Sequence, residues 1–546
     1  MNKNRTIGLY AGAALASFGS VLGGASPAGA QPVAVAPATM PPITTIDERY
    51  LSYNIEMAEV IGGNFWKPYD TSDNAVQQAT SARAASTSGG ASLQAGQDAT
   101  MFQARPPIDL TNARLRKLAA ALGPTYVRVS GTWANSVYFH DSDASALTTA
   151  PAEFKGVLTR LQWKGVVNFA SAVNAQIVTS FAISAGARDA AGVWTPDQAH
   201  RLRAYTKSIG GDIAAAEFFN EPTMPEYGGA PAGYNAAAYA RDFAVFRRFM
   251  ETAAPGTRTA GPAAVGEAVL MPAMQGGGWA SAVLRTEDLL SAAPRPVSDV
   301  FSYHFYGAAS IRCASMGEGA QTTAAAALSE EWLARADHSF AFYGGLRDRF
   351  EPGKPAWITE TADAACGGNP WAATFLDSFR FLDQLARLAR RGVNVVFHNT
   401  LAASEYGLLD QSTFAPRPNY WAALLWRRLM GPVVLDAGSS RSGGLHLYAQ
   451  CLRGRPGGVA LLAVNTSRTE PASVVLPTPA ERYTLAAAGR ELEDTRVRLN
   501  GQELALGAND ELPGLRGSHV PAGPMELTPA SITFLAVADA RNAGCH

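Results

Sequence analysis

The chain has 546 residues, of which 47% are hydrophobic, 9% aromatic and 17% charged. This composition can fill a sizeable core and excludes a wholly disordered protein, and the length allows one large and one small domain. The formal net charge of −1 gives no general attraction to polyanions, so we expect no nucleic-acid partner.

The N-terminus has the pattern of an export signal. Lys3 and Arg5 precede an apolar stretch at residues 7–22, and small residues follow at 28–30. We therefore predict that residues 1–30 are a signal peptide and that the protein is periplasmic or secreted. The stretch is short and rich in Gly and Ala, and no later segment is apolar enough to span a bilayer, so no stable membrane insertion is expected.

A Pro- and Ala-rich lead at residues 31–44 is predicted to be a linker, and the polar stretch at 71–100 a long loop. Between 45 and 428, short β-rich runs alternate with amphipathic helical patterns such as "ARLRKLAAAL" and "FLDSFRFLDQLARLARRG". The runs are residues 51–58, 125–131, 176–184, 214–222, 258–266, 299–307, 355–362 and 393–400. This alternation predicts a (β/α)8 barrel of the α/β class.

Beyond residue 428 the sequence pattern changes to short β-rich runs with alternating side-chain character, such as "LHLYAQC" and "SITFLAVAD". These runs are separated by Gly, Pro and Asn. Such runs are typical of antiparallel sheets. Residues 429–546 are therefore predicted to form a C-terminal β-sandwich.

Cysteine and histidine spacing bears on metals and disulfides. The four cysteines of an exported protein permit two disulfides in three connectivities, and none has CxxC spacing. The eight histidines contain no HExxH pattern. We expect neither a metal nor a cofactor.

Two glutamates are the candidate reacting groups. Barrel enzymes carry their catalytic residues at the C-terminal ends of the strands. Glu221, in "EFFNEP", is expected to end the fourth strand, and Glu360, in "AWITET", the seventh. Retaining glycosidases need two carboxyl groups about 5–5.5 Å apart, one protonated and one ionised. Either motif alone is weak, but the ordered pair predicts a glycosidase.

Several stretches then resemble one known family. "LGPTYVRVSGT", "FFNEP", "ITETADAACGGNPWAATFLDSF", "SEYGLLDQSTFAPRPNYWAALLWRRLMGPVV" and "VRLNGQEL" are similar to the heparanase-like glycoside hydrolases, family 79 of clan A. The resemblance implies a retaining enzyme that acts on uronic-acid glycosides. It implies that Glu221 is the general acid/base, Glu360 the nucleophile, and Asn220 a hydrogen-bond partner of the sugar 2-hydroxyl.

The resemblance also assigns substrate-binding positions. His304 and Tyr306 are expected beside the nucleophile, where the tyrosine hydroxyl can donate to Glu360 and fix its rotamer. Glu56, at the end of the first strand, is expected to bind sugar hydroxyls, with a surface carboxylate as the alternative.

The substrate carboxylate is expected to bind Tyr406 and the backbone of Gly367 and Gly368, since an anion can approach N–H groups that have no Cβ beside them. The chain departs from the family pattern at Phe219 and Cys366, which puts the pocket shape in doubt. The resemblance further implies a disulfide between Cys451 and Cys545, which leaves Cys313 and Cys366 as a second pair.

Other residues are candidates for the cleft. Aromatic side chains expected on the catalytic face are Trp66, Tyr69, Tyr227, Tyr234 and Trp279. His398 is interpreted as a satisfied core or rim histidine, and Arg312 as a candidate cleft cation. Arg387, Arg390 and Arg391 are interpreted as a solvated face of an outer helix.

The sequence leaves the mode of action open. An endo-β-glucuronidase acting on heparan-sulfate-type glycosaminoglycans is slightly favoured over an exo-acting β-glucuronidase. A non-catalytic carbohydrate-binding protein is the alternative from another class. The partner in each case is an oligo- or polysaccharide that contains uronic acid, and the oligomeric state is unknown.

Overall fold

The computed structural model describes residues 32–69, 99–144, 147, 149–273, 283–438 and 444–546. The predicted signal peptide and nearly all of the predicted loop at 71–100 lie outside these residues. Among the residues described, no helix has both the length and the apolar character needed to cross a membrane.

Eight parallel strands close into a barrel, and each of them overlaps one of the predicted runs. In spatial order they are β3 (Leu51–Glu56), β6 (Thr125–Ser130), β9 (Ala175–Ser180), β10 (Ile213–Glu217), β11 (Arg258–Val265), β12 (Val300–Ala309), β13 (Ala356–Ala365) and β14 (Val393–His398), which pairs with β3 again. Every strand lies beside its neighbour in sequence, as the repeated β/α unit requires. The predicted barrel is confirmed.

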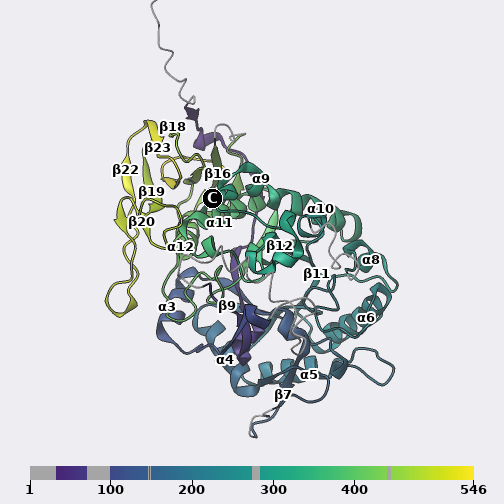
Figure 1. Cartoon of the computed structure of the whole chain (residues 1–546). Coiled ribbons are helices and arrows are strands. Elements are labelled where there is room, and N and C mark those ends of the chain that lie inside the picture. Colours follow the sequence, from purple (N-terminus) through teal and green to yellow (C-terminus); the bar gives the residue numbers. More distant parts are fainter. Residues whose placement is uncertain (1–31, 70–98, 145–146, 148, 274–282, 439–443) are drawn as a thin grey trace, which may run out of the picture. The chain divides into compact units, whose positions relative to one another are not determined.

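Helices cover the outer side of the barrel (Figure 1). The longer ones are α3 (Ala113–Leu122), α4 (Arg160–Ala172), α5 (Asp197–Ser208), α6 (Ala236–Ala253), α10 (Arg335–Phe350), α11 (Phe375–Arg390) and α12 (Pro418–Leu429). Their starts are set locally: Asn112 accepts a hydrogen bond from the Leu115 amide, and Thr159 and Gln162 form a reciprocal capping box. Their apolar faces join one large core with the barrel strands.

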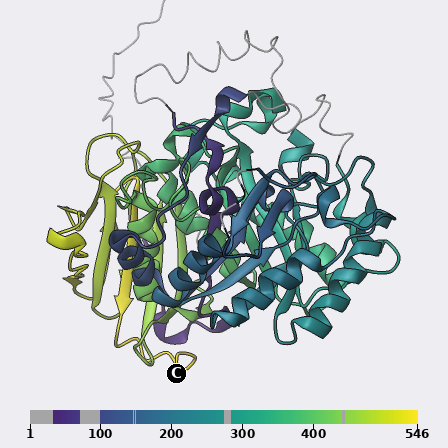
Figure 2. The same ribbon diagram turned by 90° about the horizontal axis from the view of Figure 1, so that it is seen from below.

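The C-terminal part is a sandwich of two sheets. The larger sheet has the order β2-β15-β16-β17-β24-β19-β20-β21, with β22 on β19, and the smaller one β1-β18-β23. The strands are β15 (Met430–Leu435), β16 (Leu445–Leu452), β17 (Val459–Asn465), β18 (Ala472–Leu476), β19 (Ala480–Ala487), β20 (Val497–Leu499), β21 (Gln502–Glu503), β22 (Ser518–Val520), β23 (Gly523–Leu527) and β24 (Ser531–Val537). A separate apolar cluster fills the space between the sheets. Both views place these strands on one side of the barrel (Figure 2).

The predicted linker is wrong in one respect, because residues 31–44 carry strands. β1 (Val33–Ala34) pairs with β18, and β2 (Pro42–Thr45) pairs with β15. Composition did not reveal them, since both are very short and their partners lie some 400 residues later in the chain. The segment therefore belongs to the edges of the sandwich.

The prediction that Arg387, Arg390 and Arg391 form a solvated face of an outer helix, α11, is wrong for Arg387, whereas the Arg391 side chain is 53% exposed. Arg387 is 1% exposed and donates to Asp383 (2.5 Å), Asp337 (2.8 Å) and Glu330 (2.6 Å). From the sandwich, β16 adds Tyr448, whose hydroxyl donates to Asp383 at 2.6 Å. An outer barrel helix normally faces water, but the larger sheet covers this one, so its arginine is part of an interdomain ion network.

Candidate active site

The two catalytic candidates sit differently from the prediction. β10 ends at Glu217, so Glu221 lies four residues further on, with a left-handed backbone (φ 54°). β13 continues to Ala365, so Glu360 lies inside the strand. The reason is that β12 and β13 pair as far as Ala309 and Ala365, beyond the barrel rim. The expectation that each glutamate ends its strand is therefore wrong, although both reach the same pocket.

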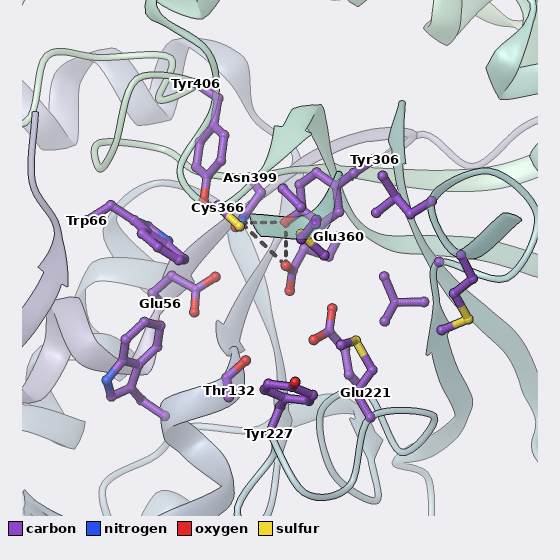
Figure 3. A pocket seen from close by; sticks show the side chains of 18 of the residues that line it. Glu56, Trp66, Thr132, Glu221, Tyr227, Tyr306, Glu360, Cys366, Asn399 and Tyr406 are labelled. Atoms are coloured by element: carbon purple, nitrogen blue, oxygen red, sulfur yellow. Dashed lines mark hydrogen bonds between the residues drawn. The ribbon is translucent and has the colours of Figure 1, made fainter. Parts of the chain in front are cut away.

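The two carboxyl groups face each other (Figure 3). One carboxylate oxygen of Glu221, one of Glu360 and a ring nitrogen of His304 lie within 4.8 Å of one another. This spacing is close to the value for retaining glycosidases and well below the 6.5–9.5 Å of inverting ones. A metal ion could fit by distance, but the Arg128 guanidinium already places a fixed positive charge there.

Glu360 accepts hydrogen bonds on both carboxylate oxygens. The Tyr306 hydroxyl donates to Oε1, and Asn399 Nδ2 approaches the same oxygen at 3.5 Å. Arg128 Nη1 donates to Oε2 at 3.1 Å. These donors, a hydroxyl, an amide and a guanidinium, fix the rotamer of the side chain and its direction towards the pocket.

Glu221 has the opposite environment. Burial raises the pKa of Glu221 to about 7, Glu217 adds to the rise, and Arg128 opposes it. His304 Nδ1 lies 3.0 Å from Glu221 Oε1, and the side chain is still 18% exposed. A carboxyl group that stays protonated near neutral pH and reaches the pocket has the properties of a general acid.

His304 orients Glu221 as a neutral imidazole. Burial lowers the pKa of His304 to about 4. Its Nε2 lies 3.3 Å from Arg128 Nη2, and because a guanidinium can only donate, Nε2 must be the acceptor. Nδ1 therefore carries the hydrogen and donates to Oε1 of Glu221, which leaves Oε2 to carry the acidic proton.

Arg128 lies at the centre of the site, and its role was not predicted from the sequence. Besides Glu360, it donates to Glu217 Oε2 at 2.9 Å and to Asn220 Oδ1 at 2.7 Å. Burial would lower the pKa of Arg128, but Glu217, Glu360 and Glu56 outweigh burial and raise it. The signal was present in "TYVRVS": a cation inside an otherwise apolar barrel strand needs buried anions.

Asn220 is fixed by its backbone as well as by Arg128. Its amide donates to Asn135 Oδ1 and its carbonyl accepts from Asn135 Nδ2, both at 2.9 Å. The side chain is 1% exposed and its Nδ2 lies 3.5 Å from Thr132 Oγ1. The residue is thus held rigidly beside Glu221, where a sugar 2-hydroxyl can reach it only through small movements.

Glu56 lies in the pocket wall and not on the surface, which rules out the surface alternative. It is 4% exposed, and its carboxylate and that of Glu59 cap α1 (Met57–Ile61) reciprocally. Burial raises the pKa of Glu56 well above its ordinary value, and the charge of Glu360 adds to the rise. A Cβ on Gly131 would stand 1.5 Å from Glu56 Oε2, so only glycine leaves room for this carboxyl group.

The carbonyls of the loop after β13 accept hydrogen bonds from neighbouring segments. The Cys366 carbonyl accepts from Ser310 Oγ at 2.9 Å, and the Gly367 carbonyl accepts from the Glu405 amide at 3.1 Å. Gly367 and Gly368 have φ of 80° and 84°, a backbone conformation that favours glycine. Their N–H groups have no Cβ beside them, which is what the close approach of an anion requires.

Tyr406 stands next to this loop and is joined to the nucleophile through an amide that the sequence did not single out. Asn399 Nδ2 donates to the hydroxyls of Tyr406 (3.2 Å) and Tyr306 (3.0 Å). His398 is a buried core histidine, as interpreted, and its Nε2 bonds the Tyr406 carbonyl at 2.6 Å. Tyr406 and Glu360 therefore share one hydrogen-bond network.

Both predicted disulfides are present, Cys313–Cys366 and Cys451–Cys545. The first ties the Gly367–Gly368 loop to the segment after β12. Arg312 reinforces it: Nη1 donates to the carbonyls of Cys366 and Gly368, and the guanidinium stacks 3.7 Å from the Tyr69 ring centroid. Arg312 thus supports the loop and is not a free cleft cation.

Only some of the aromatic side chains predicted on the catalytic face line the pocket. Trp66 and Tyr227 line the pocket. Tyr234 does not, since its hydroxyl donates to Asp242 and its ring packs under Arg188, so that prediction is wrong. Trp279 lies outside the described residues. The lining also includes side chains that the sequence did not flag: Phe65, Thr132, Trp133, Met224, Val265, Leu270, Met271, Val283, Met316 and Asn399.

Comparison with known proteins gives one family. The family model "Glycosyl hydrolase family 79, N-terminal domain" matches residues 101–386. Heparanase-like protein 1 of Arabidopsis thaliana is 28% identical over 380 residues, which are 66% of this chain and 65% of that protein. Heparanase of Mus musculus is 34% identical over 210 residues, or 36% and 39%. Baicalin-beta-D-glucuronidase of Scutellaria baicalensis is 29% identical over 187 residues, or 33% and 35%. The chain spans less than two thirds of each of these three relatives, namely 65%, 39% and 35% of their lengths.

Solved structures agree on the fold. A 4-O-α-L-rhamnosyl-β-D-glucuronidase from Fusarium oxysporum aligns with a TM-score of 0.58 at 13% identity, over 92% of this chain and 100% of that one. An α-L-arabinofuranosidase from Thermotoga maritima has the same TM-score and identity, over 93% and 99%. At such identities the likeness concerns the fold alone.

Proposed function

Because the chain belongs to glycosyl hydrolase family 79, we propose that it is a retaining β-glucuronidase with Glu360 as nucleophile and Glu221 as acid/base. Glu360 attacks the anomeric carbon while the bond to the leaving oxygen breaks and Glu221 gives that oxygen its proton. In the second step Glu221 takes a proton from water, the water oxygen attacks the same carbon, and the bond to Glu360 breaks.

The observation that carries this proposal is the contrast between two facing carboxyl groups. Glu360 accepts hydrogen bonds from Tyr306 and Arg128, whereas burial raises the pKa of Glu221 to about 7. Where two facing carboxyl groups have such different surroundings, those surroundings assign their chemical roles. A binding protein without catalysis has no need for that contrast, so the enzyme is favoured over a scaffold.

Selectivity for uronates is proposed to rest on Tyr406 and the loop that carries Gly367 and Gly368. The carbonyls of the loop are engaged by Ser310 and Glu405, and Tyr406 shares Asn399 with the nucleophile network. A carboxylate bound there by N–H groups and a phenol hydroxyl would place the sugar ring above Glu360. Asn220 and Glu56 are proposed to bind hydroxyl groups of the same sugar.

One assay series tests the function and separates its modes. An aryl β-glucuronide is incubated with the enzyme, and NMR follows the anomer that forms first: retention gives the β-anomer. In parallel, heparan sulfate is sized after incubation. Shortened chains indicate the endo mode favoured by the sequence, aryl release alone indicates an exo-enzyme, and binding of either without turnover would favour the carbohydrate-binding alternative. An α-anomer as first product contradicts the proposed mechanism.

We also propose that the chain is exported. The basic and apolar residues at its N-terminus support this, and so do two disulfides, which persist in oxidising compartments. N-terminal sequencing of protein from the periplasm or medium tests the proposal, with a start near residue 31 expected. Protein found only in the cytoplasm with an intact N-terminus would contradict it.

A further inference from the structure

The residues that line the pocket come from two groups of segments. At the ends of β3 and β14 lie the polar side chains of Glu56, Asn399 and Tyr406, with Trp66 and Cys366 beside them (Figure 3). The second group, which we call the apolar wall, comes from the turn after Glu221, the end of β11, the short α7 (Leu270–Ala273) and the segment after β12. Its side chains are apolar: Met224, Val265, Leu270, Met271 and Met316. Two of these, Val265 and Leu270, are less than 6% exposed and belong to a buried apolar cluster.

The acid decides which wall faces the leaving group. Glu221 must reach the glycosidic oxygen, so the group that departs with this oxygen lies on the Glu221 side of the bond. In Figure 3, Glu56 and Tyr406 lie on one side of Glu360, and Glu221 with Tyr227 on the other. Met224 follows directly, since its amide donates to the Glu221 carbonyl at 2.9 Å. The Val265 amide donates to Thr223 Oγ1 at 3.1 Å, so the end of β11 also lies beside the turn after Glu221, and the apolar wall extends on the leaving-group side.

No described lining residue offers a positive charge. The lining contains three carboxyl groups, Glu56, Glu221 and Glu360, and no Lys, Arg or His among the residues described. Arg128 lies beneath the pocket, fully buried, with its donors engaged by Glu217, Glu360 and Asn220. In sequence, residues 70–98 and 274–282 add one basic residue and three acidic ones, so they bring no net positive charge.

We propose that the apolar wall is a leaving-group subsite for an uncharged, apolar aglycone such as a naphthol or a substituted phenol. The inference rests on the proposed function and specifies its substrate class. Three methionines suit a planar ring, because their side chains are flexible and sulfur contacts aromatic edges favourably. A sulfated sugar in the same place would lose water without gaining a cation from the described lining.

A matched substrate pair tests the subsite. 2-Naphthyl β-glucuronide is compared with its ring-sulfonated counterpart, with rates corrected for the leaving-group pKa, and heparan sulfate is a third substrate. The naphthyl compound is expected to have a kcat/KM higher by about tenfold or more, because the sulfonate would lose water without gaining a cation. Equal or faster turnover of the sulfonated compound, or comparable turnover of heparan sulfate, overturns the subsite. Turnover of none of the three overturns the proposed function and the subsite with it.

Charge variants of the wall make the test specific. Met271→Lys and, separately, Met224→Lys place a cation where the aglycone is expected to lie. Each should move the naphthyl-to-sulfonate ratio towards the sulfonated substrate by about tenfold. Met271→Leu, which keeps the wall apolar, should retain the naphthyl preference. If both lysine variants fold, as judged by circular dichroism, and leave the ratio unchanged, the wall does not contact the aglycone.

Discussion

At the scale of single residues, the positive charge of Arg128 is shared between the carboxylates of Glu360 and Glu217. Arg128 could neutralise Glu360 so fully that the nucleophile would be weak, but it also pairs with Glu217. Ser302 Oγ donates to the other oxygen of Glu217 at 3.0 Å, so this counter-ion is fixed. Burial alone would raise the pKa of Glu217, yet the Arg128 guanidinium holds it low. A permanently ionised Glu217 thus balances Arg128.

This balance predicts the pH dependence of catalysis. The acid form of Glu221 is active and its pKa is about 7, so kcat/KM should fall as the pH rises through about 7. Glu217 raises the pKa of Glu221, so Glu217→Gln should move the alkaline limb to lower pH. Ser302→Ala, which removes a hydrogen bond but no charge, is the control and should leave the limb in place. An unshifted limb in folded Glu217→Gln enzyme would contradict the assignment.

Tyr406 is predicted to distinguish glucuronides from glucosides. Tyr406→Phe should lower kcat/KM on a glucuronide by roughly ten- to a hundredfold, since one hydrogen bond to a charged group is worth about 1.5–3 kcal/mol. The matching glucoside should change little. Equal losses on both sugars would show that Tyr406 does not bind the carboxylate.

The reacting groups were predictable from sequence, but their supporting residues were only partly so. Glu221, Glu360, His304 and Tyr306 stand in short motifs at predicted strands. Arg128 and Asn399 did not, because their roles depend on contacts across the barrel, between β6, β13 and the segment after β14. Long-range contacts of this kind leave no local pattern, apart from a charge within an apolar strand.

Among the structural elements, strand boundaries differed most from the predictions. All eight barrel strands were foreseen, because alternation of β-rich and helical segments is a strong signal. Their ends were not, since a strand ends where its neighbour stops pairing: β13 continues to Ala365 only because β12 accompanies it. The burial of α11 could not be predicted either, because the strand that packs over it, β16, belongs to the other domain.

The ion network on α11 predicts a large effect on stability. Arg387→Met should lower the free energy of unfolding by about 3–5 kcal/mol, because it leaves buried carboxylates without their cation. Arg390→Met is the matched control: Arg390 is 28% exposed and pairs with Asp436 at 3.3 Å, so its loss should cost about 0–1 kcal/mol. Urea unfolding followed by fluorescence measures the free energy of unfolding of both variants. Similar losses would show that the buried ion pairs of Arg387 contribute no more than the partly exposed pair of Arg390.

For the molecule as a whole, both chain ends of the described part meet in the sandwich. Asn542 Nδ2 donates to the carbonyls of Pro37 (2.7 Å) and Met40 (2.9 Å), and Cys545 is bonded to Cys451 of β16. This explains why the lead at 31–44 is not a linker. The change of sequence pattern near residue 428 predicts two domains. It does not predict that residues 33–45 complete the second domain.

The disulfide of the sandwich is predicted to stabilise it measurably. Cys451 and Cys545 are 94 residues apart, and closing such a loop contributes on the order of 4–5 kcal/mol in the chain-entropy model. The Cys451→Ser/Cys545→Ser double variant should therefore unfold at a lower urea concentration. An unchanged midpoint under oxidising conditions would show that the bond adds nothing to the packing of the C-terminal segment.

The central claim is that Glu360 forms a glycosyl ester and Glu221 supplies the proton. A 2-deoxy-2-fluoro-β-glucuronide with a good leaving group slows the second step, so the ester accumulates and its peptide can be found by mass spectrometry. We predict one added fluoroglucuronosyl group on the peptide that contains Glu360, in the wild type and in Glu221→Gln, and none in Glu360→Gln. A label on another residue, or a labelled Glu360→Gln enzyme, would contradict the account.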